Sequence, residues 1–242
     1  MCEWEWPQPG RTRLIMPPAL AMMGTGAPDP EPDMLARLDD AHVMMMGDNP
    51  ALPRMPAKPS LFDFFRLRFG GITGRHLLIS ADRAMRNNEP DAVVMACLLH
   101  DIANAALVRT DHGYWGAQMV APYVSEEVAF AVKYHQALRY FADEENGYAY
   151  PESYHAFFGP DYVPPDYIRA DADYARNHEF YITARKVTIY DTYLFEQWPV
   201  PDYDRFDDLL ARNFRQPAEG LGFDGSASAH MWRTVIWPNN FL

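Results

Sequence analysis

The stretch Met95-Ala-Cys-Leu-Leu-His-Asp-Ile-Ala-Asn104 decides the fold, because an adjacent His100-Asp101 pair ends a run of apolar residues. Helical spacing places the imidazole of His100 on a core-facing stripe with Val93, Ala96 and Cys97. An unpartnered carboxylate buried beside it would cost roughly several kcal/mol, and a bound metal ion is the commonest compensation. Taken alone, the pair has a simpler interpretation, a core histidine whose neighbouring aspartate faces solvent.

Composition limits the functions that this pair can serve. The chain has 242 residues, is 48% hydrophobic and carries a formal net charge of -12. That length is enough for one domain with a full core. The acidic balance argues against a general nucleic-acid or membrane-surface binder and leaves a small molecule as the expected partner. An excess of carboxylates also suits a cation-binding site.

The cysteines and the apolar runs indicate the compartment. Cys2 and Cys97 are the only cysteines, so no disulfide framework is predicted. No apolar run approaches the length of a membrane span, and residues 1–26 lack the order of a signal peptide. We expect an unprocessed cytoplasmic protein that is a monomer or a homodimer.

The chain divides into three parts by composition. Residues 1–59 are rich in proline and methionine and predict a partly ordered, extended arm, with one helix over 34–46. Residues 60–215 carry the helical periodicity and the candidate ligands. Residues 216–242 form a tail rich in glycine, proline and tryptophan, which we expect to pack on the domain.

Helical signals predict an all-α fold. Ser60 and Asp63 form a capping box, and Ser125 precedes two glutamates as a second helix cap. The predicted helices run over residues 60–69, 74–86, 91–101, 112–121, 125–138, 180–197 and 207–214.

Residues 143–177 lose this periodicity. Tyrosines alternate there with prolines and glycines, which predicts a long, irregular, aromatic cover segment. Such a segment is either a lid over a pocket or plain surface packing.

Imidazole and carboxylate side chains recur on the predicted inward faces. Together they form a ligand set for a hard or borderline metal ion. Any single one is more simply structural, but so many on inward faces indicate a metal site. The candidate ligands are His76, His100, Asp101, His112, His135 and Asp191.

The order of these ligands resembles the HD-domain superfamily of all-helical metal enzymes. His76 is followed by His100-Asp101, and Asp191 lies on a downstream helix. Asp111-His112 and His135-Gln-Ala-Leu-Arg139 are similar to the segments that bind a second metal in a subset of the superfamily. That subset is the mixed-valence diiron oxygenases, which include phosphonate-cleaving HD oxygenases and, more distantly, myo-inositol oxygenase. The similarity covers residues 74–140 and 184–194, about a third of the chain.

The resemblance implies an HD-type helical bundle, a dinuclear centre and a reaction. One iron ion would take His76, His100, Asp101 and Asp191, and the other would take Asp101, His112 and His135, with Asp101 as the bridge. The implied cofactors are two iron ions in the Fe²⁺/Fe³⁺ states, with O₂ as co-substrate. Such enzymes abstract a hydrogen from a substrate carbon and then cleave a carbon-carbon or carbon-phosphorus bond.

Asp101, Asn104 and Arg139 are the residues that we assign to catalysis, the last two as substrate-binding groups. Arg139 lies one turn after His135, where a guanidinium suits a phosphonate, phosphate or carboxylate. Its alternative role is a helix-end arginine paired with Asp143 or Glu144.

Some positions depart from the family pattern. Asn104 stands where phosphonate-cleaving relatives have a histidine and inositol oxygenase has a lysine. Arg66 and Phe69 occupy the places of the tyrosine and glutamate that gate the second iron, and Phe157-Phe158-Gly159-Pro160 only weakly resembles the polar substrate loop. These differences predict a less polar substrate than a small aminophosphonate, with an acidic group.

Two other functions are compatible with the same residues. A metal-dependent HD phosphohydrolase acting on a phosphate ester or nucleotide would use the same ligands to activate water. A helical binding module with a degenerate site is the third alternative, and the complete ligand set disfavours it. His42, His155, His178 and His230 enter none of these schemes, and we expect them to be surface or capping residues.

Overall fold

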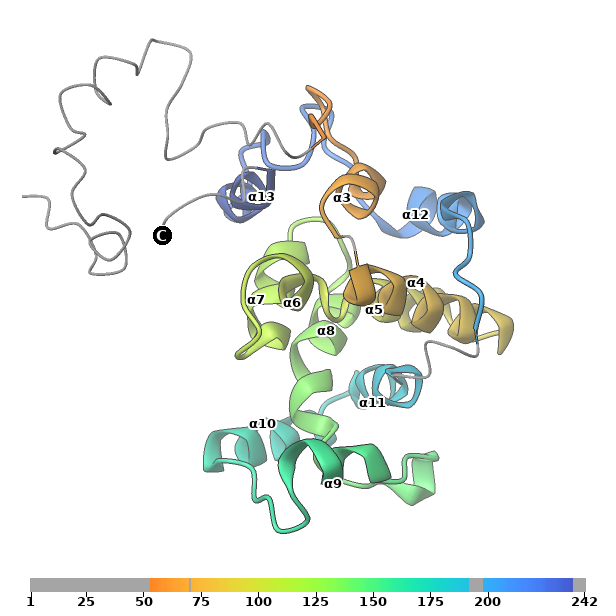
Figure 1. Ribbon diagram of the computed structural model, residues 1–242, viewed down its shortest axis with the longest axis vertical. Helices are drawn as coiled ribbons and strands as arrows, with labels where there is room; N and C mark the ends of the chain where they lie inside the picture. Colours follow the sequence, from red (N-terminus) through yellow and green to blue (C-terminus); the bar gives the residue numbers. More distant parts are fainter. Residues whose placement is uncertain (1–52, 70, 192–197, 237–242) are drawn as a thin grey trace, which may run out of the picture. The chain divides into compact units, whose positions relative to one another are not determined.

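The computed structural model describes residues 53–69, 71–191 and 198–236. Contact clustering divides the chain into two units, 1–44 and 45–242, and the described residues belong to the second. This unit is all-α, as predicted, and over the described ranges its only β feature is an isolated bridge between Asp143 and Tyr148 (Figure 1). The predicted helix at 34–46 and residues 1–52 of the predicted arm lie outside the described residues.

The first described helices begin at local signals in the sequence. Helix α3 spans Leu61–Leu67, and the predicted capping box is confirmed. Ser60 Oγ accepts a hydrogen bond from the Asp63 amide at 3.3 Å, and the Asp63 carboxylate accepts one from the Ser60 amide at 2.8 Å. Helix α4 spans Gly71–Arg86 and begins three residues earlier than the periodicity indicated.

Two nine-residue helices and one shorter helix surround the His100-Asp101 pair. Helix α5 spans Asp91–Leu99, α6 spans Ile102–Ala106 and α7 spans His112–Val120. Helices α5 and α7 match the prediction, whereas α6 falls in a stretch expected to be a loop. Its sequence is rich in alanine, the best helix former, but it is too short to establish a period.

Helix α8, Glu126–Leu138, is central to the bundle. Ser125 caps it as predicted, because its hydroxyl accepts a hydrogen bond from the Val128 amide at 3.3 Å. The helix contacts α5, α7, α10 and α11. Side chains on several of its faces are therefore buried, including Val128, Phe130 and Ala131.

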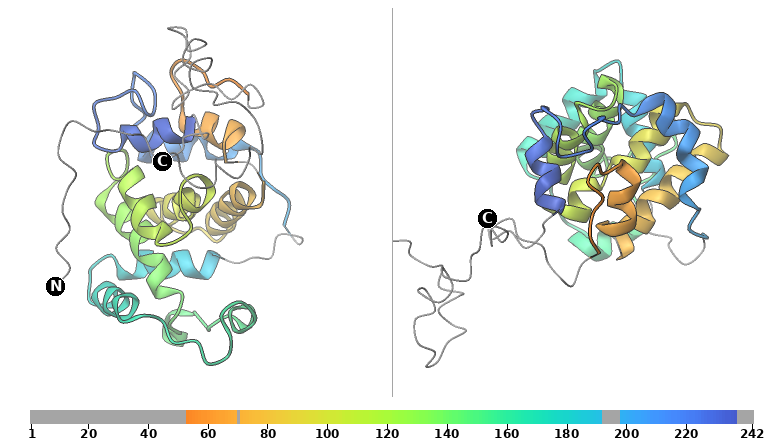
Figure 2. Two further views of the ribbon diagram at one scale, coloured as in Figure 1. Left: turned by 60° about the vertical axis from the view of Figure 1, so that its left-hand side comes forward. Right: turned by 90° about the horizontal axis from the view of Figure 1, so that it is seen from above.

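The prediction of an irregular segment over 143–177 is wrong. The segment contains the 3₁₀ turn η1, Glu144–Asn146, and the helices α9, Glu152–Phe158, and α10, Asp166–Arg176. Pro151 and Pro165 occupy their N-cap positions, where a missing amide proton costs little, so these prolines begin helices. Figures 1 and 2 show both helices at the end of the bundle where α8 ends.

The last described helices bring the C-terminal part of the chain back to the bundle. Helix α11 spans Tyr181–Tyr190, followed by the 3₁₀ turn η2, Tyr203–Phe206, and by α12, Asp207–Asn213. Asp191 is the C-cap of α11. The predicted continuation of that helix over 192–197 lies outside the described residues.

Helix α13, Ala229–Ile236, was not predicted. Its Trp232 is fully buried, with ring centroids 4.8 Å from Phe64 and 6.2 Å from Tyr123. The indole Nε1 donates to the Met119 carbonyl at 3.0 Å. The tryptophan therefore joins α13 to α3 and to the end of α7. Over the described ranges, no helix has both the length and the apolar character needed to cross a bilayer.

We expect Trp232→Ala to lower the free energy of unfolding by about 3–5 kcal/mol, because it empties a fully enclosed aromatic contact and removes one of the two hydrogen bonds to the Met119 carbonyl, leaving that of Ser228. Urea denaturation followed by far-ultraviolet circular dichroism measures the effect. Trp115→Ala is the matched control, since this side chain is 43% exposed. Equal losses for the two variants would contradict the assigned packing of α13.

Candidate metal centre

Six ionisable side chains meet in the interior of the bundle, each between 0 and 4% exposed. Five of them lie at or within a turn of a helix end, where the chain direction changes and side chains from neighbouring helices converge. They are His76 within α4, His100 after α5, Asp101 before α6, His112 at the start of α7, His135 in the last turn of α8 and Asp191 after α11.

The first triad consists of His76, His100 and Asp191. The Nε2 atoms of the two imidazoles are 3.0 Å apart. Asp191 Oδ1 lies 3.0 Å from His76 Nε2 and 3.5 Å from His100 Nε2. These atoms come from three helices, yet all lie close enough to surround one metal ion.

The second triad consists of Asp101, His112 and His135. Asp101 Oδ1 lies 2.9 Å from His112 Nε2 and 3.7 Å from His135 Nε2. The two imidazole Nε2 atoms are 3.3 Å apart. This triad has the same composition as the first, two imidazoles and one carboxylate.

The two triads adjoin each other through the His100-Asp101 pair. His100 belongs to the first triad, while the next residue in the chain supplies the carboxylate of the second. The ring centroids of His100 and His135 are 4.9 Å apart. One ligand atom from each of His100, Asp101 and His135 also lies within 4.8 Å of the other two. The six side chains are therefore one continuous cluster.

Three backbone carbonyls orient three of the imidazoles. The Nδ1 atoms of His100, His112 and His135 lie 2.8, 2.9 and 2.7 Å from the carbonyl oxygens of Cys97, Arg109 and Val132. A carbonyl only accepts hydrogen bonds, so each Nδ1 carries the proton. In the neutral ring, Nε2 then presents a lone pair to the cluster, which is the arrangement of metal-binding histidines.

These lone pairs make the cluster electrostatically incomplete. Imidazole Nε2 atoms face each other at 3.0 and 3.3 Å, and carboxylate oxygens lie beside them. Such contacts repel unless a proton or a cation lies between the atoms. A metal ion relieves several of these contacts at once, and imidazole with carboxylate suits iron, manganese or zinc.

The pKa values of the cluster residues reflect the same imbalance. Burial lowers the pKa of His100, but Asp101 and Asp191 outweigh it and raise the value to about 9. Burial, together with the positive charge of His100, lowers the pKa of His135 to about 4 despite its contact with Asp101. Burial also disfavours the ionised form of Asp191, yet its bonds to His100 and His76 leave its pKa below the usual range.

Asn104 lies directly beside the cluster. Its Nδ2 donates to Asp101 Oδ2 at 3.1 Å, while Asp101 Oδ1 faces the two imidazoles of the second triad. The amide therefore orients the carboxylate. The substrate-binding role predicted for Asn104 stays a prediction.

Arg139 lies one turn beyond His135 in an aromatic environment. Its guanidinium is 5.1 Å from the Tyr140 ring and 5.7 Å from the rings of Tyr154 and Phe158. Nη2 donates to the Tyr140 hydroxyl at 3.1 Å, while the buried Nε has no acceptor in the part of the chain that the structure describes. The alternative of a pair with Asp143 is not observed, because Asp143 pairs with Arg185.

Arg185 is the residue near the cluster that sequence reasoning missed. Its side chain is fully buried in α11, and its guanidinium lies 4.7 Å from the Tyr148 ring. An arginine within a predicted helix is ordinarily a surface residue, so nothing in the pattern indicated its burial.

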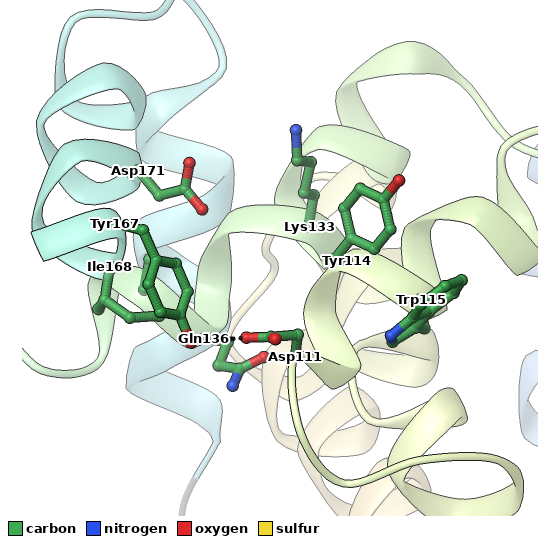
Figure 3. A pocket seen from close by; sticks show the side chains of 9 residues that line it. Asp111, Tyr114, Trp115, Lys133, Gln136, Tyr167, Ile168 and Asp171 are labelled. Atoms are coloured by element: carbon green, nitrogen blue, oxygen red, sulfur yellow. Dashed lines mark hydrogen bonds between the residues drawn. The ribbon is translucent and has the colours of Figure 1, made fainter. Parts of the chain in front are cut away.

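A pocket of about 310 Å³ opens between α7, α8 and α10. Two of its lining residues are sequence neighbours of cluster histidines. Asp111 precedes His112, and Gln136 follows His135. Figure 3 shows Tyr167 and Asp171 on the α10 side of the pocket and Lys133 on the other, with the Tyr167 hydroxyl donating to Asp111. None of the six cluster residues lines this pocket, so it is a separate feature.

The histidines that were not predicted to bind metal lie outside the cluster, as far as the structure describes them. His178 stacks on Phe130, with ring centroids 4.1 Å apart, and its Nδ1 accepts a hydrogen bond from the Phe180 amide. His178 is therefore partly buried beside the start of α11 and does not cap that helix, whose N-cap is Phe180. His230 is exposed, and His155 is partly exposed. His42 lies outside the described residues.

Comparison of the chain with protein-family models finds no match, and the search of curated proteins also finds none. The functional argument therefore depends on the geometry of the cluster and on the sequence pattern.

We expect metal binding at pH 7 to release protons. The pKa of His100 is about 9 without metal, so its imidazole is protonated at pH 7 and must lose a proton to bind an ion. Zn²⁺ affinity should therefore rise as the pH increases toward 9. Isothermal titration of Zn²⁺ into the metal-free protein, in two buffers of different ionisation enthalpy, measures the proton count. Identical heats in both buffers would rule this protonation out.

We further expect His112→Ala to lower the metal content to about one ion per chain, because it removes a ligand of the second triad and leaves the first intact. Inductively coupled plasma mass spectrometry of the purified protein measures this. His155→Ala is the control, because it removes an imidazole outside the cluster. Unchanged metal content in His112→Ala would show that this triad holds no ion.

Proposed function

We propose that the protein is a diiron oxygenase of the HD-domain type. It would use O₂ to abstract a hydrogen from a small anionic substrate and then cleave a carbon-carbon or carbon-phosphorus bond. The observation that carries this proposal is the pair of adjoining triads joined at His100-Asp101. A site for a single ion needs only one such triad, and the second has no evident role without a second ion.

The donor set supports iron. Two imidazoles and one carboxylate in each triad are ligands for a borderline metal and leave positions for other molecules. His76, His100 and Asp191 would hold one ion, and Asp101, His112 and His135 the other, with Asp101 as the shared carboxylate. When bound, an iron pair of this kind supplies the electrons that reduce O₂ and the oxidising power that activates a carbon-hydrogen bond.

The side chains around the cluster would control orientation and access. Hydrogen bonds to backbone carbonyls hold the rings of His100, His112 and His135, so the ligands are oriented before a metal binds. Asn104 holds the second oxygen of Asp101. Burial of the whole cluster excludes bulk water, which would otherwise quench a reactive intermediate.

Arg139 would bind the acidic group of the substrate. It is one turn beyond His135, and aromatic rings rather than carboxylates surround its guanidinium. An arginine with an unused donor in apolar surroundings is a strong binder of an oxyanion. The aromatic rings around this guanidinium favour a substrate with an apolar part next to its acidic group.

The phosphohydrolase alternative would use the same ligands. Hydrolysis of a phosphate ester benefits from a cation near the scissile oxygen. The position after His100-Asp101 nearest the cluster instead holds the neutral amide of Asn104, which is bonded to Asp101. This neutral amide supplies no such cation, which disfavours hydrolysis.

We expect the full-length protein, loaded anaerobically with iron and partially reduced, to give an electron paramagnetic resonance signal of a coupled mixed-valence pair. Two ions that share the Asp101 carboxylate are close enough to couple, whereas isolated ions are not. The Asp101→Ala variant should lose the coupled signal. His155→Ala is the matched control and should retain it.

A different set of results would support the phosphohydrolase. Turnover of p-nitrophenyl phosphate or a nucleotide with Mn²⁺ or Mg²⁺, together with the absence of a coupled signal in the iron-loaded protein, would contradict the oxygenase assignment and support the phosphohydrolase.

A further inference from the structure

Two arginines near the end of α8, the partly buried Arg139 and the fully buried Arg185, each have a buried hydrogen-bond donor without an acceptor. These donors are Arg139 Nε and Arg185 Nη2, and neither atom has a partner among the residues that the structure describes. Buried donors in folded proteins almost always have an acceptor, so two unsatisfied donors within one region indicate a missing acceptor.

The rest of Arg185 is firmly held. Its Nε lies 3.3 Å from Asp143 Oδ2 and donates to the Tyr181 hydroxyl at 3.2 Å. Its Nη1 donates to the Leu138 carbonyl at 3.1 Å and to Thr188 Oγ1 at 3.2 Å. These contacts immobilise the guanidinium and leave Nη2 alone, so little conformational entropy would be lost when Nη2 binds an acceptor.

The two arginines share neighbours. The Tyr148 hydroxyl donates to the Arg139 carbonyl at 2.7 Å, and the same tyrosine's ring lies 4.7 Å from the Arg185 guanidinium. Arg185 also bonds the carbonyl of Leu138, the residue just before Arg139. Both arginines stand on elements that carry cluster residues, since α8 contains His135 and α11 leads to Asp191.

The charges of this region do not balance. Burial opposes ionisation of Asp143, but bonds from Tyr181, Asn146 and Arg185 lower the pKa of this carboxyl, so it is ionised and neutralises Arg185. Within the described ranges, no carboxylate lies at ion-pair distance from Arg139. Burial opposes the charge of Arg139, while Tyr140, Tyr154 and the more distant Asp191 raise its pKa, so Arg139 is charged without a direct counter-ion and matches a monoanion better than a dianion.

We propose that Arg139 and Arg185 form a carboxylate-binding subsite, in which one guanidinium supplies the uncompensated charge and the other a fixed donor. The rings of Tyr140, Tyr154 and Phe158 would contact the apolar part of the same molecule. The assignment of that molecule as the substrate rests on the proposed function. The substrate would then be an organic monocarboxylic acid whose carboxylate lies away from the oxidised carbon.

Acetate is the probe that tests the subsite. We expect sodium acetate to raise the melting temperature of the full-length protein saturably, measured at constant ionic strength against sodium chloride. Arg139→Gln and Arg185→Lys should each weaken the apparent acetate affinity about tenfold or more, because each removes a charge-assisted hydrogen bond or misplaces its donor. Arg139→Gln keeps the test decisive if the Arg185 variant does not fold.

Arg176→Gln is the matched control. This arginine also lies over an aromatic ring, 5.7 Å from the Phe141 centroid, but it is exposed. Its loss should leave the acetate effect unchanged. An unsaturable effect in the wild-type protein, an undiminished effect in Arg139→Gln, or tighter binding of inorganic phosphate than of acetate would overturn the proposal.

The outcome is separate from that of the iron experiment. Acetate binding that depends on both arginines, without a coupled iron signal, would keep the subsite and remove the oxygenase assignment. A coupled signal without arginine-dependent acetate binding would do the reverse.

Discussion

The structure depends on one electrostatic constraint, the presence of four imidazoles and two carboxylates in a dry helical core. Burial of so many polar groups opposes folding unless their lone pairs and charges are satisfied. Backbone carbonyls satisfy the Nδ1 side of three rings, which turns the Nε2 atoms inward toward the carboxylates. A bound cation would relieve several of the remaining repulsions together, so the metal centre that we propose follows from the same buried cluster.

The helix ends explain how distant parts of the chain form this cluster. His100 follows α5 and Asp191 follows α11, so both side chains project from positions where the backbone leaves the helix. His112 begins α7 and is preceded by Asp111 in a left-handed conformation, φ 51°, which reverses the chain at that point. Where a helix is interrupted in this way, the side chains of adjacent residues project in different directions. His100 and Asp101 can therefore belong to separate triads.

Local signals made much of this architecture predictable, and their absence explains the failures. The hydroxyls of Ser60 and Ser125 mark helix starts by bonding nearby amides, which requires no knowledge of the rest of the fold. Helix α10 buries only a narrow face, formed by Ile168, Ala172 and Ala175, so its tyrosines obscured the period. The cluster residues could be identified because histidine and aspartate are unusual on apolar helix faces. Arg185 could not, since its burial depends on tertiary contacts with Asp143, Leu138 and Tyr148.

The positions of the two arginines bear on how a substrate would be held. A dinuclear centre with open coordination positions binds many small oxygen-bearing molecules equally well, so it selects poorly by itself. Selectivity must then come from groups that contact the other end of the molecule. The end of α8 offers such groups, a fixed donor on Arg185 and an uncompensated charge on Arg139, within an aromatic wall. Because α8 carries His135 and Arg139 is its C-cap, this one helix would set the distance between the proposed anion subsite and the proposed metal ligands, so the length of the substrate would be selected together with its charge.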